Sequence, residues 1–145
     1  MTINVILNKL YQNYAQVFAP QPMMTIQRTS IALVKKGYIQ IPLDYVQFLM
    51  LSDGLSWNGV ELFSIDPHER KDTVFLQPTL MGIQEELTLK KLYPKTLVVG
   101  IGPEELIVYF NETHAYHLLD RYTYETVVKL PRLSDVLYFY GLKEA

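Results

Sequence analysis

The stretch of sequence that decides the fold runs from residue 41 to residue 57 and reads IPLDYVQFLMLSDGLSW. Pro42 has a fixed φ and no backbone donor, so it suits the first position of a helix. Asp44 then lies in the first turn, where the helix dipole favours a carboxylate. Three large apolar residues share one side of this helix: Tyr45, Phe48 and Leu49. Asp53-Gly54 ends the element, so the segment predicts a short helix that packs on a core, followed by a turn.

Two further helical patterns precede this segment. Apolar residues spaced by three and four predict a helix over residues 2–18, which Thr2 can cap. Two prolines then break the helix, because proline lacks the backbone donor, so residues 19–24 are expected to be a linker inside the domain. A second stripe predicts another helix, which Gly37 ends in a left-handed cap. The stripe consists of Ile26, Thr29, Leu33 and Val34.

The pattern changes to strands after the tight turn at Asn58-Gly59. Residues 60–65 are expected to form one strand, followed by a charged loop at residues 68–72 and an amphipathic helix at residues 80–92. Four β-branched or aromatic runs then predict a meander, and a closing helix follows it. The runs are residues 97–101, 106–110, 115–119 and 126–130, and the closing helix is residues 133–140, ending at Gly141. Short connections favour antiparallel neighbours, so the order predicts an α+β fold: an antiparallel or mixed sheet with helices packed on one face.

Length and composition indicate a single domain over residues 1–145, with its core region in residues 25–145. The chain has 145 residues, of which 49% are hydrophobic and 19% charged, as in ordinary globular proteins. The net charge of -2 gives no basic field for nucleic acid or for a membrane surface. The N-terminus lacks a signal-peptide pattern, and no apolar run approaches the roughly 20 residues that span a bilayer, so we expect a cytoplasmic protein. The absence of cysteine excludes disulfides, a thiol nucleophile and Cys-ligated zinc.

No motif for catalysis or for a cofactor emerges from the sequence. His114, His117 and Asp120 have the residue types of a metal site. Side chains alternate along a strand, however, so His117 points away from the other two, and we interpret both histidines as ordinary sheet residues. The glycines of residues 99–102 resemble a phosphate loop, but Pro103 and the acidic pair after it favour a turn between strands. We therefore expect no catalytic residues, no metal and no cofactor.

The aromatic residues are more informative, since tyrosine is abundant in this chain. Eleven tyrosines supply large rings with polar tips, which suit protein interfaces as well as the boundary of a core. Tyr122 and Tyr124 lie in a polar connection and are candidates for partner binding. Trp57 either covers the core or forms an exposed anchor. His68 and Glu104 complete the candidate partner-binding residues, and with Trp57 they would line the cleft of a small-ligand or hydrolytic protein in the alternative interpretation.

The helix of residues 41–49, IPLDYVQFL, resembles a signature of the SUKH superfamily, which includes fungal glucan-synthesis regulators of the Smi/Knr type and many bacterial immunity proteins. Residues 51–55, LSDGL, resemble the glycine-bearing stop that follows it, although Asn-Gly is more usual there. The order of strands and the final helix downstream is also similar. Residues 116–123, YHLLDRYT, resemble the bacterial YrhA-like branch in particular.

The resemblance implies a non-enzymatic domain that binds other proteins, in bacteria commonly by neutralising a toxin. It supplies no catalytic residues and no binding site that can be transferred by residue. The expectation is thus an immunity protein that is a monomer or a weak homodimer, with a protein partner and without nucleic-acid or membrane binding. The alternatives are a regulatory or scaffold protein of the same type without a toxin partner, a small-ligand-binding protein, and a module for self-association.

Overall fold

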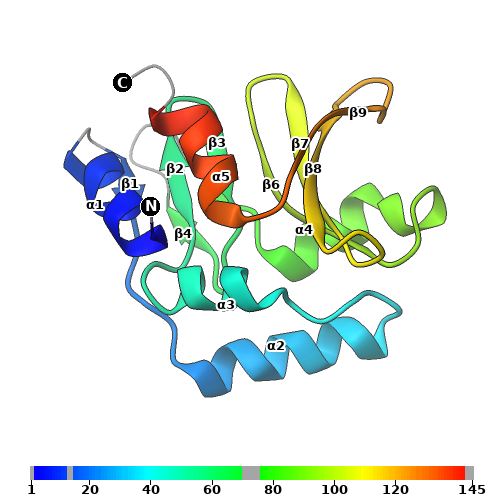
Figure 1. Ribbon diagram of the computed structural model, residues 1–145. Coiled ribbons are helices and arrows are strands. Elements are labelled where there is room, and N and C mark those ends of the chain that lie inside the picture. The colour runs from blue at the N-terminus through cyan, green and yellow to red at the C-terminus, as the bar shows by residue number, and fades with distance from the viewer. Residues whose placement is uncertain (1, 13–14, 70–75, 143–145) are drawn as a thin grey trace.

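The described part of the chain, residues 2–12, 15–69 and 76–142 of a computed structural model, forms five α-helices and nine strands (Figure 1). The helices are α1 (Ile3–Gln12), α2 (Met23–Lys35), α3 (Leu43–Leu49), α4 (Leu80–Leu87) and α5 (Leu133–Leu137), with a 3-10 turn η1 (Leu89–Lys91) and a π-helical turn η2 (Tyr138–Leu142). The strands are β1 (Gln16–Val17), β2 (Leu55–Trp57), β3 (Val60–Leu62), β4 (His68–Glu69), β5 (Leu76–Gln77), β6 (Thr96–Ile101), β7 (Glu105–Phe110), β8 (Ala115–Asp120) and β9 (Thr126–Leu130).

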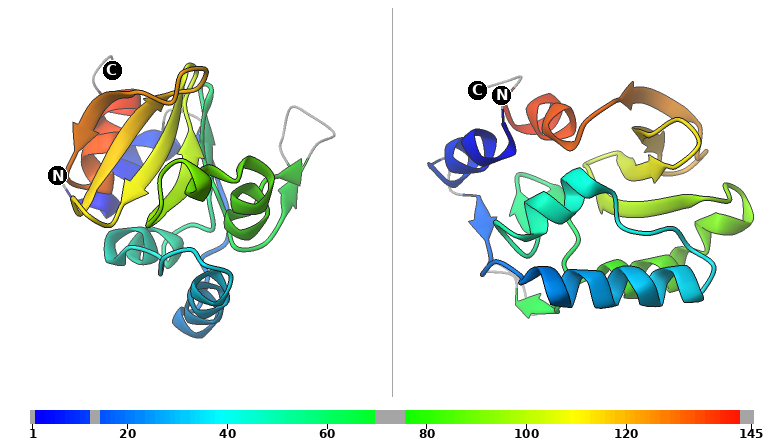
Figure 2. Two further views of the ribbon diagram at one scale, coloured as in Figure 1. Left: turned by 90° about the vertical axis from the view of Figure 1, so that its right-hand side faces the viewer. Right: turned by 60° about the horizontal axis from the view of Figure 1, so that its bottom comes forward.

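Seven of these strands form one sheet in the order β1-β2-β3-β6-β7-β8-β9, and every neighbouring pair is antiparallel. Strands β6 to β9 are consecutive in the chain and adjacent in the sheet, so the predicted meander and the α+β fold class are confirmed. α1 and α5 lie together against one side of the curved sheet, while α3 and α2 lie one above the other at its lower end (Figures 1 and 2). β4 and β5 form a separate two-stranded ladder.

The turn at residues 58–59 joins strands β2 and β3. The sequence patterns indicated β3 but not β2. Asn58 and Gly59 both have positive φ, 49° and 83°, which is the geometry of a tight hairpin turn whose twist matches that of its strands. β2 before the turn pairs with β3 after it, with Trp57 opposite Val60. The expected strand over residues 60–65 ends at Leu62: the Phe63 amide still donates to the Val99 carbonyl at 2.8 Å, but the Ile65 amide donates to Asp53 instead, at 2.7 Å.

The first helix is shorter than expected from its apolar spacing. α1 ends at Gln12, and the prediction of a helix through residue 18 is wrong, since Gln16 and Val17 pair with Ser56 and Leu55 as the edge strand β1. Residues 13–14 lie outside the described part of the chain. The edge of β2 offers main-chain partners that a longer helix could not use, so sheet pairing overrides local periodicity. The linker is also shorter than residues 19–24, because α2 begins at Met23 after Pro22.

Three further boundaries differ from the sequence pattern. The helix expected over residues 80–92 breaks at Thr88, which takes a left-handed conformation with φ 49°, so α4 is followed by a separate 3-10 turn. His68 and Glu69 of the expected charged loop form β4, while residues 70–72 lie outside the described residues. The closing helix does not end at Gly141 but passes through it as a π-helical turn, and Leu10 packs where a side chain on this glycine would lie.

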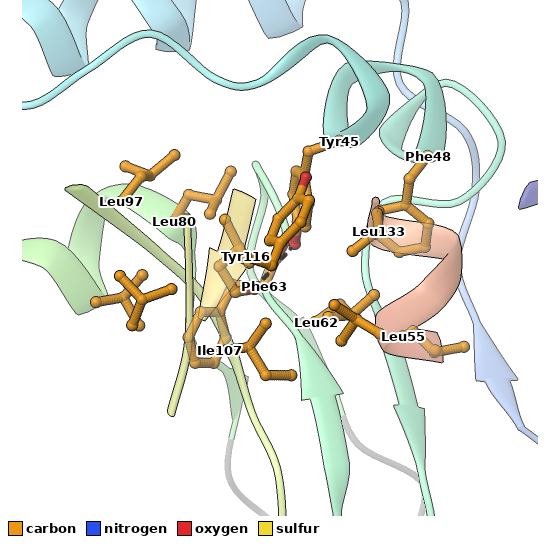
Figure 3. Packing of buried hydrophobic residues seen from close by; sticks show 14 of the residues in the cluster. Tyr45, Phe48, Leu55, Leu62, Phe63, Leu80, Leu97, Ile107, Tyr116 and Leu133 are labelled. Atoms are coloured by element: carbon orange, nitrogen blue, oxygen red, sulfur yellow. Dashed lines mark hydrogen bonds between the residues drawn. The ribbon is translucent and has the colours of Figure 1, made fainter. Parts of the chain in front are cut away.

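Helix α3 packs on the core as its sequence pattern indicates. Tyr45 is fully buried, and the single proton of its hydroxyl is shared between the carbonyl oxygens of Phe63 at 2.5 Å and Val99 at 3.0 Å. Figure 3 shows the Tyr45 ring pointing from α3 toward Phe63 and Tyr116. Asp44 accepts hydrogen bonds from the Tyr116 hydroxyl at 2.6 Å and from the Leu133 amide at 2.8 Å. One short helix thus connects β3, β6, β8 and the start of α5.

A glutamine side chain supplies hydrogen bonds to the part of the β6 main chain that is not paired with β3. β3 pairs with β6 only at Gly100 and Ile101. Farther along, the buried Gln84 of α4 donates from Nε2 to the Val98 carbonyl at 2.5 Å and accepts from the Val98 amide at 2.9 Å. A buried amide would cost free energy without a partner, so this pair of bonds fixes α4 beside β6.

Candidate functional site

The connections β2–β3, β6–β7 and β8–β9 lie together at one end of the sheet, which we call the turn end (residues 58–59, 102–104 and 121–125). The Arg121 amide donates to the Glu104 carbonyl at 3.1 Å, and the Arg121 guanidinium donates from Nη1 to the Pro103 carbonyl at 3.3 Å. A Cβ on Gly59 would lie 3.4 Å from Pro103 Cγ. Three connections that are distant in the sequence therefore form one surface, at the top of Figure 1.

Four of the five residues that the sequence proposed for partner binding lie at this end or in the strand beside it. Glu104 is exposed in the β6–β7 connection, and Tyr122 and Tyr124 lie in the β8–β9 connection. Trp57 is half-buried at the end of β2 and packs against the core, so it covers the core on one side and faces outward on the other. The fifth residue, His68, lies elsewhere.

Tyr122 is the most prominent side chain of the turn end, because 85% of its surface is exposed. The connection beneath it is nevertheless well defined. Asp120 Oδ1 accepts from the amides of Tyr122 and Thr123, each at 2.9 Å. These bonds, from Thr123 first and Tyr122 second, hold the pKa of the Asp120 carboxyl below its ordinary value. The ring is therefore presented to solvent from a backbone whose conformation is fixed.

Tyr124 has a supporting position in the same connection. It is half-buried with φ 60°, and its amide donates to the Asp120 carbonyl at 2.8 Å. Tyr93 follows η1 in the chain, and its hydroxyl donates to the Tyr124 carbonyl at 2.8 Å. Tyr124 thus holds the turn that presents Tyr122, and only its partly exposed face is open to a partner.

Carboxylates outnumber cations at the turn end. The connections of the turn end and the strand residues next to them carry Glu61, Glu104, Glu105, Asp120 and Glu125, whereas Arg121 is the cation in these segments. Behind them, the Tyr140 hydroxyl donates to Glu105 at 2.9 Å, and its ring occupies the space that a side chain on Gly102 would need. Burial, and then the Glu105 carboxylate, raise the pKa of Tyr140, so this hydroxyl keeps its proton and remains a donor. The turn end is thus acidic and aromatic, and Tyr140 supports it from the interior side.

His68 belongs to a different cluster, which is organised by the fully buried carboxylate of Asp53. Asp53 accepts from the Ile65 amide at 2.7 Å, the Asp66 amide at 3.2 Å, the Gln21 side chain at 2.8 Å and His68 Nε2 at 2.7 Å. These bonds connect the segment before α2 to the chain that leaves β3. The sequence marked Asp53 only as a helix stop, since nothing in its spacing reveals four partners.

Among the described residues, neither partner of the Asp53–His68 pair is hydrogen-bonded to a serine or threonine hydroxyl. His68 Nε2 is occupied by the carboxylate, and the ring is stacked on Phe18 with centroids 4.4 Å apart. The nearby Ser52 hydroxyl donates to the Gly54 carbonyl at 2.6 Å and accepts from the Phe18 amide at 3.0 Å. In the part of the chain that the structure describes, the hydrogen bonds of His68 and Ser52 join neighbouring segments of the backbone and of Asp53.

His117 of β8 also has a structural environment. His117 lies between the hydroxyls of Thr113 at 3.1 Å and Thr126 at 3.2 Å, and it stacks on Phe110 at 3.9 Å. Burial, and then the charge of Lys129, lower its pKa. His114 lies in the turn before β8 with φ 51°, so its interpretation as a sheet residue is wrong, and Asp120 caps the next turn. No group of three His, Asp or Glu side chains in the described parts of the chain could hold a metal ion.

The glycines of residues 99–102 serve the packing of the sheet. A Cβ on Gly100 would lie 2.4 Å from the Glu61 carbonyl oxygen and 2.9 Å from Leu62 Cδ2, so only glycine allows β3 and β6 to approach there. Gly102 similarly makes room for Tyr140. The residues continue from β6 into a turn toward β7, and no helix follows them as a phosphate loop requires.

No family model matches this chain, and no curated protein matches it. None of the helices in the described ranges is long and apolar enough to cross a membrane.

Proposed function

We propose that this chain is a non-enzymatic protein-binding domain of the SUKH type that acts in the cytoplasm as an immunity protein, neutralising a toxin by covering its functional surface. The resemblance of residues 41–49 and 116–123 to that superfamily supports this proposal. The same segments form the α3 helix and the β8 strand, which Asp44 and Tyr116 join. The alternative within the same class is a regulatory or scaffold protein without a toxin partner.

The observation that carries the proposal is the presentation of Tyr122. The backbone beneath this ring, which is 85% exposed, is already fixed by Asp120, so a partner that covers Tyr122 has only the side chain itself to order. Tyrosine is among the residues that most often dominate the binding energy of interfaces. The surrounding carboxylates would favour a partner with a cationic surface and speed their encounter.

The experiment compares partner capture by three forms of the chain. The tagged wild-type chain, Tyr122→Ala and Tyr11→Ala are each used to purify partners from the source cells, because Tyr11 is another exposed tyrosine, 64% exposed, on α1. We expect one protein to copurify with the wild type and with Tyr11→Ala and to be lost with Tyr122→Ala. Truncating a central interface tyrosine costs about 2 kcal/mol or more, which weakens binding about 30-fold.

The immunity role has its own test. Toxins encoded beside the gene are expressed with and without the chain, and growth of the cells is measured. Protection that Tyr122→Ala abolishes supports immunity. Partner capture without protection against any neighbouring toxin supports the regulatory alternative, and copurification of no protein contradicts both.

A further inference from the structure

The charges of this chain are segregated along the sequence. Asp44 is the first carboxylate, and four cations precede it: Lys9, Arg28, Lys35 and Lys36. Of the 13 cations and 15 carboxylates in the chain, the remaining residues thus hold nine cations and all 15 carboxylates. Three of the four early cations are on α2 or at its C-cap. A chain with a small net charge therefore has one cationic helix.

The same helix exposes apolar side chains on its outer side. Only Ile26 and Leu33 of α2 are buried. Ile31 is 56% exposed and Val34 52% exposed, although the sequence pattern assigned Val34 to the buried stripe, so that assignment is wrong. α2 crosses the bottom of the molecule beneath α3, with the other side of the helix open in both views (Figures 1 and 2). Two neighbouring branched residues thus lie on an uncovered face.

A groove is present at this position. It has a volume of about 320 Å³ and is lined by Ser30, Ile31, Val34, Lys35 and Gln40. One wall is α2 and the other is the chain that returns from α2 to α3. The Ser30 hydroxyl accepts from the Ile41 amide at 2.9 Å, which holds the two walls together. The groove is therefore preformed, and its volume suits one large apolar side chain.

The cations of α2 restrict which partners fit: Lys35 lines the groove, and Arg28 lies seven residues, or two helical turns, before it on the same face of the helix. Lys36 forms an ion pair with Glu85, whereas Arg28 and Lys35 have no carboxylate partner among the described residues. A second copy docking through its own α2 would bring like charges together. A lipid surface is a poor match, because Gln27 and Arg28 interrupt the apolar side of this helix between Met24 and Ile31. An acidic protein segment complements both the cations and the groove.

We propose that this groove, at the opposite end of the sheet from the turn end, binds an apolar side chain that a partner protein presents on an acidic segment. The proposal does not rest on the function proposed for Tyr122, because it uses different residues on a different face. If both surfaces are occupied, the domain connects a partner at its acidic end to another at its cationic end.

The test uses a displayed library of random 16-residue peptides selected against the full chain. We expect enriched peptides to combine a large apolar residue with flanking Asp or Glu. Labelled enriched peptides are then titrated, by fluorescence anisotropy, against the wild type, against Arg28→Glu combined with Lys35→Glu, and against a control in which the exposed Lys91 and Lys129 are both changed to Glu. The first double variant should weaken binding at least about tenfold, and the charge-matched control less than about twofold.

Several results would overturn the proposal. Enrichment of no peptide, or of peptides without acidic residues, would do so. Peptides that lose binding with Tyr122→Ala but not with the Arg28 and Lys35 changes would assign recognition to the turn end, leaving the proposed function intact. Sedimentation that shows self-association abolished by the same double variant would assign the groove to the acidic end of a second copy. If the chain binds vesicles of anionic lipid and the same double variant weakens that binding as much as peptide binding, the groove would be assigned to a membrane.

Discussion

Replacing Asp53 tests how much of the fold depends on one buried carboxylate. Asp53→Ala removes the acceptor for two main-chain amides and for the side chains of Gln21 and His68. The two side chains lie near the surface and can turn toward water. The amides of Ile65 and Asp66 are partly buried, and an unsatisfied buried donor costs about 1–3 kcal/mol. With the loss of the charge-assisted bonds, we expect unfolding free energy to fall by about 3–5 kcal/mol.

Urea unfolding followed by fluorescence of Trp57, the single tryptophan, measures this change. At a urea dependence of about 1–3 kcal/mol per molar, the midpoint should move down by more than about 1 M. Asp53→Asn keeps one carbonyl acceptor and should cost less than Asp53→Ala. His68→Ala removes only a partly exposed partner and should cost about 1 kcal/mol. An Asp53→Ala protein within about 0.5 kcal/mol of the wild type would refute the role of this cluster.

Three other changes test the packing of the sheet. Gly100→Ala places a Cβ 2.4 Å from the Glu61 carbonyl oxygen, so it should lower the unfolding free energy by about 1–3 kcal/mol in the same urea assay, and a neutral result would contradict the close approach of β3 and β6. Tyr45→Phe leaves two buried carbonyls without their hydroxyl donor and should cost about 1–3 kcal/mol in thermal unfolding, whereas an unchanged melting temperature would show that those bonds contribute nothing. Burial and the charge of Lys129 lower the pKa of His117 from its ordinary 6.5 in the folded protein. As the pH falls, the unfolded chain therefore binds a proton at this histidine before the folded chain does. The stability that His117 contributes is present above pH 6.5 and is lost as the pH falls through the lower folded-state pKa. His117→Gln should flatten this part of the pH dependence of unfolding, and a slope identical to that of the wild type would refute it.

The elements that sequence patterns predicted correctly are those in which local and tertiary preferences agree. The α3 helix has a proline at its start and an aromatic face that fits the core, and the last four strands have β-branched runs separated by turn residues. Gln16 and Val17 were misassigned because their apolar spacing continues that of α1, while their main chain is used by β2. Thr88 is β-branched and such residues rarely take positive φ, so its left-handed conformation, which separates α4 from η1, could not be predicted from its residue type.

The candidate sites were less predictable, because they depend on which residues the turns bring together. The aromatic and polar character of residues 121–125 was sufficient to select Tyr122. It did not reveal that Asp120 fixes this turn or that Arg121 joins it to Glu104. His68 was placed with the other candidates, although it pairs with Asp53 in another part of the molecule. The sequence shows that cations but no carboxylates precede Asp44. It does not show that most of these cations lie on one exposed helix.

Photo-crosslinking at Tyr122 in the source cells is the most direct test of the central claim, that the turn end binds a protein. A photoreactive phenylalanine analogue replaces Tyr122 in one form of the chain and Tyr11, on α1, in the matched control, and the crosslinked products are identified by mass spectrometry. We expect one protein that crosslinks at position 122 and not at position 11. No crosslinked protein at position 122, or the same products from both positions, would contradict it.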